Sequence, residues 1–178
     1  MSGLSYRPLC DVWILARSKV PYYGAFPAGF LHRARALLGV NQEQSVLHVC
    51  AGHVRDYPYR GFEVHDKTLD LDPTCDPDYL QDARDQLPLN SGQLWSAILI
   101  DRPYSHEEAQ HYTPGSDALP NINTLLRNAL QSVQVAGRVG VLDYIWPHPG
   151  KMGKEVAVIA VGTGRNNRAR WFTVFERF

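Results

Sequence analysis

The sequence predicts one α/β domain over residues 1–178, in which a sheet of buried strands carries helices on both faces. Short apolar runs alternate along the chain with segments of helical periodicity. The final two apolar runs are joined by a loop containing two glycines, which is typical of an antiparallel hairpin. The composition is 44% hydrophobic and 20% charged over 178 residues, which is ordinary for a single globular domain.

The individual elements follow from these patterns. Residues 1–29 are punctuated by proline and glycine and are expected to be irregular, apart from one short strand over 11–16. Residues 30–38 and 121–133 have apolar side chains at helical spacing, and a glycine follows each, at 39 and at 137. The remaining apolar runs predict strands over 46–50, 67–71, 79–81, 96–100, 139–145, 155–162 and 170–176.

Ligands of such sheets bind beyond the carboxyl ends of the strands, so the residues that follow each strand are the candidate site. The first set is Cys50-Ala51-Gly52, where a glycine lets the backbone approach a ligand closely, or simply turns the chain. The second is Asp70-Leu71. Asp70 follows Gly52 by 18 residues, close to the spacing at which an acidic side chain binds ribose hydroxyls; alternatively it is a loop carboxylate before a proline.

Two further strand ends carry polar groups. Asp82-Ala83 follows the short third strand, and its carboxylate either faces an adenine amino group or caps the loop. The fourth strand ends in Asp101-Arg102-Pro103-Tyr104. There Asp101 is suited to accept a hydrogen bond from an exocyclic amine, and Tyr104 to stack on a flipped base. The alternative is an ordinary turn after a core strand.

Taken together, these segments resemble class I S-adenosylmethionine-dependent methyltransferases. The stretch Asp101-Arg102-Pro103-Tyr104 is similar to the D-P-P-Y motif of enzymes that methylate amino groups of nucleic-acid bases. The nearest resemblance is to small phage-encoded proteins assigned as DNA methyltransferases, and it covers about residues 11–178. They share the segments at 22–27, 46–50, 69–73, 82–85 and 166–168.

The resemblance implies a Rossmann-like methyltransferase fold, with a mostly parallel seven-stranded sheet and a C-terminal antiparallel hairpin. It implies S-adenosylmethionine as the cofactor, held by Cys50, Ala51, Gly52, Asp70, Leu71, Asp82 and Ala83. It also implies methyl transfer to an exocyclic amine, adenine N6 in DNA above all, with Asp101, Pro103 and Tyr104 as catalytic residues. Two positions depart from the pattern: Arg102 replaces a proline and adds a charge beside the reacting centre, and Ala51 stands where a second glycine is expected.

The charges are segregated along the chain and suggest a polyanionic partner. Residues 1–40 and 151–178 each carry a net charge of +4, whereas 41–150 carry −8, so the total is zero. If the two ends meet in space, they form one basic face that binds phosphates, unless these charges are ordinary solvated surface. We expect Arg165, Arg168 and Arg170 to contact nucleic acid there, with DNA favoured over RNA.

Other classes are disfavoured. The seven histidines lack metal-ligand spacing, and the three cysteines form no C-x-x-C pair, so we expect no metal site and a reduced cytoplasmic protein, in the host cytoplasm if phage-encoded. The longest apolar run, 156–161, is too short to span a membrane, and no hydrolase elbow or phosphate loop occurs. Two alternatives stay open: a binding protein without turnover, and a methyltransferase for RNA or a small amine.

Overall fold

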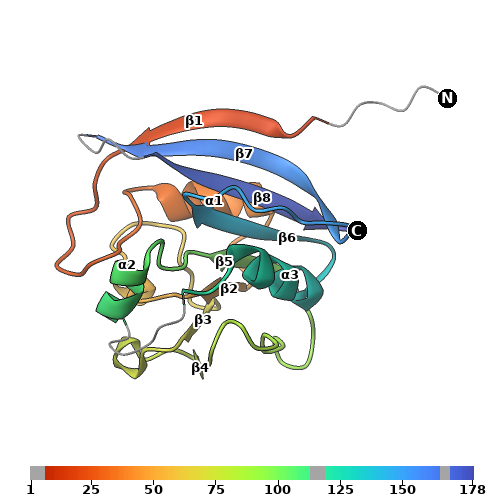
Figure 1. The fold of residues 1–178 in the computed structure, drawn as a ribbon, viewed down its shortest axis with the longest axis horizontal. Coiled ribbons are helices and arrows are strands. Elements are labelled where there is room, and N and C mark those ends of the chain that lie inside the picture. The colour runs from red at the N-terminus through yellow and green to blue at the C-terminus, as the bar shows by residue number, and fades with distance from the viewer. Residues whose placement is uncertain (1–6, 113–118, 165–168) are drawn as a thin grey trace.

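One twisted sheet of eight strands forms the centre of the molecule, in the order β1-β7-β8-β6-β5-β2-β3-β4 (Figure 1). The computed structural model describes residues 7–112, 119–164 and 169–178. The strands are β1 (Leu9–Leu15), β2 (Val46–Val49), β3 (Lys67–Asp70), β4 (Tyr79–Leu80), β5 (Trp95–Ile100), β6 (Val133–Asp143), β7 (Gly153–Thr163) and β8 (Ala169–Arg177). The strand β8 runs antiparallel to β6 and β7, and the other neighbouring pairs are parallel.

The predicted α/β class, the mostly parallel sheet and the C-terminal antiparallel hairpin are confirmed. The number of seven strands was wrong, because the segment 1–29 contributes a full strand at the edge of the sheet. There β1 pairs with β7 in parallel over seven residues, from Leu9 opposite Ala157 to Leu15 opposite Thr163. Trp13 and Leu15 point into the core, whereas the neighbouring side chains are exposed.

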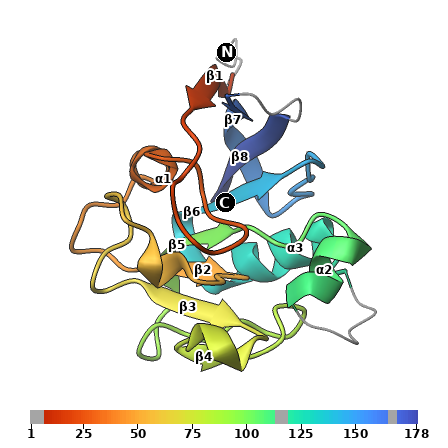
Figure 2. The ribbon, with the colours of Figure 1, turned by 90° about the vertical axis from the view of Figure 1, so that its left-hand side faces the viewer.

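Two helices cover opposite faces of the sheet, α1 (Phe30–Leu38) on one side and α3 (Ile122–Ser132) on the other (Figure 2). The apolar face of α1 packs with the inner side chains of β1, β7 and β8 in one core. The apolar face of α3 packs on β2, β5 and β6 in a second core. This arrangement leaves the carboxyl ends of the central strands open at one edge of the sheet.

The bounds of α1 agree with the prediction, because Gly39 takes a left-handed φ of 71° and ends the helix. The prediction that Gly137 ends the second helix was wrong. The helix α3 ends at Ser132 and continues directly into β6, whose register against β5 shifts between Trp95 and Ala97. Gly137 lies inside this irregular stretch, where an added Cβ would be 2.8 Å from the carbonyl oxygen of Gln134.

A third helix, α2 (His106–Tyr112), follows the fourth predicted site segment and was missed in the sequence. Its residues are mostly polar, so it has no apolar periodicity to reveal it. The available signal was the spacing of Ser105 and Glu108, which is that of a capping box. In the structure the backbone N–H of Glu108 donates to Oγ of Ser105 at 3.2 Å, as an N-cap requires.

The pairing of β1 with β7 brings the two basic ends of the chain together, which is the condition for a shared basic face. Some of this positive charge is nevertheless paired within the molecule. Arg35 forms a buried ion pair with Asp66 at 2.9 Å, and Lys154 contacts Glu176 at 3.0 Å. The meeting of the ends therefore does not make all of their charge available to an external polyanion.

Candidate active site

A cavity of about 440 Å³ lies at the carboxyl edge of the sheet, which is within the size range of small-molecule sites. All predicted site residues within the described ranges line it: Cys50, Ala51, Gly52, Asp70, Leu71, Asp82, Ala83, Asp101, Pro103, Tyr104 and Arg170. Arg165 and Arg168 lie outside the described residues. The structure thus brings four separate strand ends to one place.

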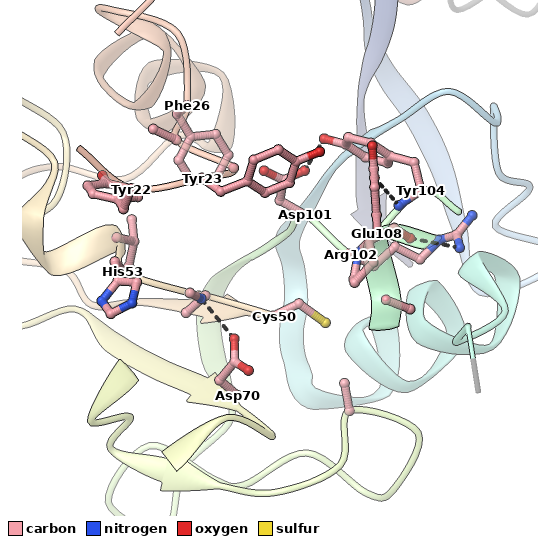
Figure 3. A pocket seen from close by; sticks show the side chains of 18 of the residues that line it. Tyr22, Tyr23, Phe26, Cys50, His53, Asp70, Asp101, Arg102, Tyr104 and Glu108 are labelled. Atoms are coloured by element: carbon pink, nitrogen blue, oxygen red, sulfur yellow. Dashed lines mark hydrogen bonds between the residues drawn. The ribbon is translucent and has the colours of Figure 1, made fainter. Parts of the chain in front are cut away.

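The turn after β2 forms one wall of the cavity (Figure 3). Cys50 and Gly52 both have left-handed backbones there, with φ of 56° and 49°. Ala51 has no positive φ, so the non-glycine residue with a left-handed backbone in this turn is Cys50. A left-handed cysteine is strained, since its Cβ crowds the following carbonyl. Burial, followed by the charge of Asp70, raises the pKa of the Cys50 thiol, so the group stays protonated.

Asp70 ends β3 and holds this turn in place. Its Oδ2 accepts from the backbone N–H of Gly52 at 2.8 Å, and its Oδ1 accepts from that of Asp72 at 3.0 Å. A carboxylate offers about four acceptor sites, so both oxygens keep capacity for a further donor. The geometry suits a ligand whose hydroxyl groups approach Asp70 from the cavity.

Asp82 also lines the cavity, but its carboxylate is engaged within the protein. Both oxygens accept from Nε of Arg84, at 3.0 and 2.9 Å, and the Arg84 backbone N–H donates to Oδ1 at 2.8 Å. These bonds from Arg84 lower the pKa of Asp82. Two roles were expected for Asp82 from the sequence, a loop cap or an adenine contact. The structure shows the local role, in which Asp82 accepts hydrogen bonds from Arg84.

The segment after β5 carries the most perturbed group of the site. Asp101 accepts a short hydrogen bond on Oδ1 from the Tyr104 hydroxyl, and Nη1 of Arg170 donates to that same hydroxyl oxygen at 3.0 Å. Burial raises the pKa of Asp101 to about 6, although Arg170 and Tyr104 act in the opposite direction. A carboxyl group titrating near neutral pH in a cavity is a candidate for chemistry.

Arg102 does not add a charge beside Asp101, and this expectation was wrong. Its side chain turns away toward the end of β6, where Nε lies 2.8 Å from Oδ2 of Asp143, and the two side chains are 2% and 1% exposed. The guanidinium also donates to the carbonyl oxygen of Pro103 at 3.2 Å. The residue that replaces the motif proline thus braces the turn from behind.

Tyr104 is packed on several sides rather than standing free for stacking. Its ring contacts Tyr144 edge-to-face with centroids 4.8 Å apart, and the Arg170 guanidinium lies 5.8 Å from its centroid. Its backbone N–H donates to Oε2 of Glu108 at 2.9 Å (Figure 3). Arg170, predicted to face nucleic acid, therefore has a partner inside the cavity.

The N-terminal segment supplies wall residues that the sequence reasoning assigned to no site. Tyr22, Tyr23 and Phe26 line the cavity across from Asp70. The ring of Tyr22 packs against that of His53, with centroids 5.7 Å apart (Figure 3). The Tyr57 hydroxyl donates to the carbonyl oxygen of Pro27 at 2.6 Å and anchors the segment. The signal in the sequence was the segment 22–27, Tyr-Tyr-Gly-Ala-Phe-Pro, which is one of those that carry the resemblance.

Metal sites and membrane-spanning helices are absent from the described ranges 7–112, 119–164 and 169–178. Within them, no three histidine, cysteine, aspartate or glutamate side chains are grouped so as to hold a metal ion. No helix in this part of the chain is long and apolar enough to cross a membrane.

No protein-family model matches the sequence, and no curated protein matches it. Solved structures do match in fold. TrmN from Thermus thermophilus superimposes with a TM-score of 0.62 at 16% identity, over 88% of this chain and 50% of that one. The rRNA methyltransferase aviRa from Streptomyces viridochromogenes gives 0.54 at 15% identity, over 90% and 88%. The N-methyltransferase NodS from Bradyrhizobium japonicum gives 0.53 at 12% identity, over 82% and 94%.

These similarities establish the fold, which is that of S-adenosylmethionine-dependent methyltransferases. The chain spans half the length of TrmN and most of the length of the two other proteins. The structural neighbours include a NodS complex with S-adenosyl-L-homocysteine.

Proposed function

We propose that this protein is an S-adenosylmethionine-dependent methyltransferase that acts on an exocyclic amine of a nucleic-acid base. The observation that carries the proposal is the convergence of two turns on one cavity. The Cys50–Gly52 turn, tied to Asp70, lies on one side, and the Asp101–Tyr104 turn lies on another. The first suits a nucleoside cofactor, the second suits an amine, and the fold places them next to each other.

The side chains that line the cavity fit S-adenosylmethionine. Asp70 retains acceptor capacity for ribose hydroxyls, and its bond to Gly52 orients the backbone turn that would hold the methionine portion. Leu71 and Ala83 offer apolar surface for the adenine ring, whereas the Asp82 carboxylate contributes only if its bonds with Arg84 rearrange. These residues fit a nucleoside with a charged tail, and the bound cofactor would supply an electrophilic methyl group on a sulfonium.

The chain's own residues would align the acceptor and take up its hydrogen bonds. Asp101 accepts from the substrate amine, which orients the nitrogen lone pair toward the methyl group. With the cofactor bound, its methyl carbon would pass to this nitrogen, and the sulfur would keep the electron pair of the broken carbon–sulfur bond. The amine then loses one proton, for which the Asp101 carboxylate is the nearest base. Pro103 stiffens the turn, and Tyr104 positions Asp101 through its hydroxyl.

DNA and RNA are both candidate substrates, so the assay compares the two polymers. Adenine N6 in DNA is the prediction from the D-P-P-Y-like stretch and the resemblance to phage-encoded enzymes. RNA is the second candidate, supported by structural neighbours described as an rRNA methyltransferase and an rRNA methylase. A cytoplasmic location is part of the same proposal, because either polymer is met there.

A binding protein without turnover is the second candidate function. The observation that favours it is that Asp101 is already bonded to Tyr104, while Arg102 replaces the motif proline. Binding alone would need the cofactor cavity but not an accessible Asp101.

The test combines binding with turnover. Purified protein is titrated with S-adenosylhomocysteine in a calorimeter, then incubated with methyl-labelled S-adenosylmethionine and DNA, RNA or adenosine, and the nucleosides are analysed by mass spectrometry. Methylated amine in the parent and none in Asp101→Asn supports the proposal. Binding of S-adenosylhomocysteine without label transfer to any acceptor assigns the non-catalytic function, and absence of both overturns the cofactor assignment.

A further inference from the structure

The Tyr104 hydroxyl sits between two groups of opposite character. Arg170, on β8, contributes Nη1 at 3.0 Å from the hydroxyl oxygen, and Asp101, at the end of β5, contributes Oδ1 as the other partner. Arg170 is 66 positions from Tyr104 in the sequence, whereas Asp101 is three positions from it. Only the antiparallel placement of β8 beside β6 brings Arg170 to this edge of the sheet.

The donor and acceptor chemistry of the three groups leaves one arrangement of protons. A guanidinium has five N–H donors and no acceptor, so the contact with Arg170 requires the tyrosine oxygen to accept. Tyr104 has one hydroxyl proton, and that proton must then point to its remaining partner, Oδ1 of Asp101. Burial, with the nearby charge of Asp101, raises the pKa of Tyr104, so the proton stays on the hydroxyl.

We propose that Arg170 is a positioning residue. Its hydrogen bond orients the Tyr104 hydroxyl so that Tyr104 donates to Asp101, and Asp101 thereby remains a hydrogen-bond acceptor facing the cavity. The positive charge of Arg170 acts in the same direction, because it stabilises the carboxylate form of Asp101. The significance for an amine substrate rests on the proposed function. The orientation of the three groups does not depend on it.

The surroundings of Asp101 explain why such a device is needed. Apart from Arg170 and Tyr104, the charged and titratable groups that act on it are Asp143 on β6, Glu108 on α2 and the Cys50 thiol after β2. Two of these are carboxylates, which favour the protonated form of Asp101. Arg102 is committed to Asp143 through their ion pair, so Arg170 is the cation that opposes burial at Asp101. Without it, the carboxyl group would hold its proton and offer a donor to an incoming amine.

The test is a titration of Asp101 followed by carbon-13 NMR in protein labelled at the aspartate carboxyl carbons, with Asp101→Asn identifying the resonance. Arg170→Met should raise the midpoint by about one pH unit or more, since a nearby opposite charge lowers a carboxyl pKa by about 1–3 units. Arg170→Lys should restore most of the parental midpoint. Arg177→Met, which removes an arginine from the same strand away from the cavity, should leave it unchanged.

An Asp101 midpoint in Arg170→Met equal to that of the parent overturns the proposal. If Arg170→Met does not fold, Arg170→Ala also removes both the donor and the charge, and an unshifted midpoint there is equally decisive. Where methyl transfer is measurable, the acid limb of its pH profile should move upward in Arg170→Met with the Km for cofactor retained. A shifted midpoint in a protein that transfers no methyl group refutes the proposed function and leaves the role of Arg170 intact.

Discussion

Replacing Arg102 by proline would restore the motif residue, and from the sequence we expect this change to hold or raise the rate of methyl transfer. The structure reverses that expectation. Arg102 and Asp143 form an ion pair at 2.8 Å with almost no solvent exposure, so the substitution leaves the Asp143 carboxylate buried without its cation. One hydrogen bond to it survives, from the backbone N–H of Ile145 at 2.8 Å.

The size of the loss follows from the burial of the pair. Removing one partner of a buried ion pair costs about 3–5 kcal/mol of unfolding free energy, because the other charge loses its compensation. For a domain of this length, each kcal/mol lowers Tm by about 2–4 °C, so we expect a drop of roughly 6–20 °C. Burial already raises the pKa of Asp143 in the parent, and without Arg102 the shift should grow, which lets acid recover part of the loss.

The assay is denaturant unfolding in a double-mutant cycle. Arg102→Met removes the charge without the ring constraint of proline, and Asp143→Asn keeps an acceptor for Ile145 while removing the other charge. The double variant should recover much of the loss of Arg102→Met, since neither charge is then left alone. A point mutation typically lowers the free energy of unfolding by about 1 kcal/mol. If Arg102→Met lowers it by no more than that, the ion pair does not brace this turn.

Three further predictions concern the site. Burial raises the pKa of Asp101 from 3.8 to about 6, so the native state binds this proton more tightly and its ionisation lowers stability as pH rises from about 4 through 6. Above pH 7, Asp101→Asn should therefore have a free energy of unfolding higher than that of the parent by roughly 3 kcal/mol at most, and this difference should shrink toward pH 4. Methyl transfer should be lost, and calorimetry across this pH range tests the sign of the stability difference. Asp70→Ala should weaken S-adenosylhomocysteine binding about 10- to 150-fold, because a charge-assisted hydrogen bond contributes roughly 1.5–3 kcal/mol, and unchanged affinity by calorimetry would remove Asp70 from the ribose site. Changing Arg165 and Arg168 to Glu should flatten the salt dependence of nucleic-acid binding by about 0.7–0.9 in log–log slope for each lost phosphate contact, and an unaltered slope would make them ordinary surface charges.

The parts of the fold that were predictable from sequence are those in which local periodicity and burial agree. The helix Phe30–Leu38 has a clear apolar face and a glycine in the left-handed conformation at its end. The strand Trp95–Ile100 is apolar apart from Ser96, because it is buried in the middle of the sheet. By contrast, β1 has mostly exposed side chains, so its pattern predicted only a short strand over 11–16, and the pairing with β7 that extends it over Leu9–Leu15 is not visible locally. The helix α2 was missed because its polar residues carry only a capping signal.

The site shows the same division. The strand-end rule placed Gly52, Asp70 and Asp101 on one cavity, because the carboxyl ends of parallel strands share an edge. The rule cannot say which partner a side chain has. Arg102 with Asp143 is a contact across 41 residues, and Arg170 with Tyr104 is one across 66. Such partners come from the sheet order alone, and they changed the interpretation of both arginines.

The parallel pairing of β1 with β7 has a consequence for how the protein is made. Residues 9–15 are synthesised long before the strand that pairs with them, Gly153–Thr163. Until then the stretch LCDVWIL has no strand beside it, and an unpaired apolar strand is prone to associate with other chains. The core on the α1 face also joins Trp13 and Phe30 to Phe172, so it cannot close before β8 has been synthesised. Shortened chains that lack β7 and β8 should therefore aggregate rather than form a smaller stable domain.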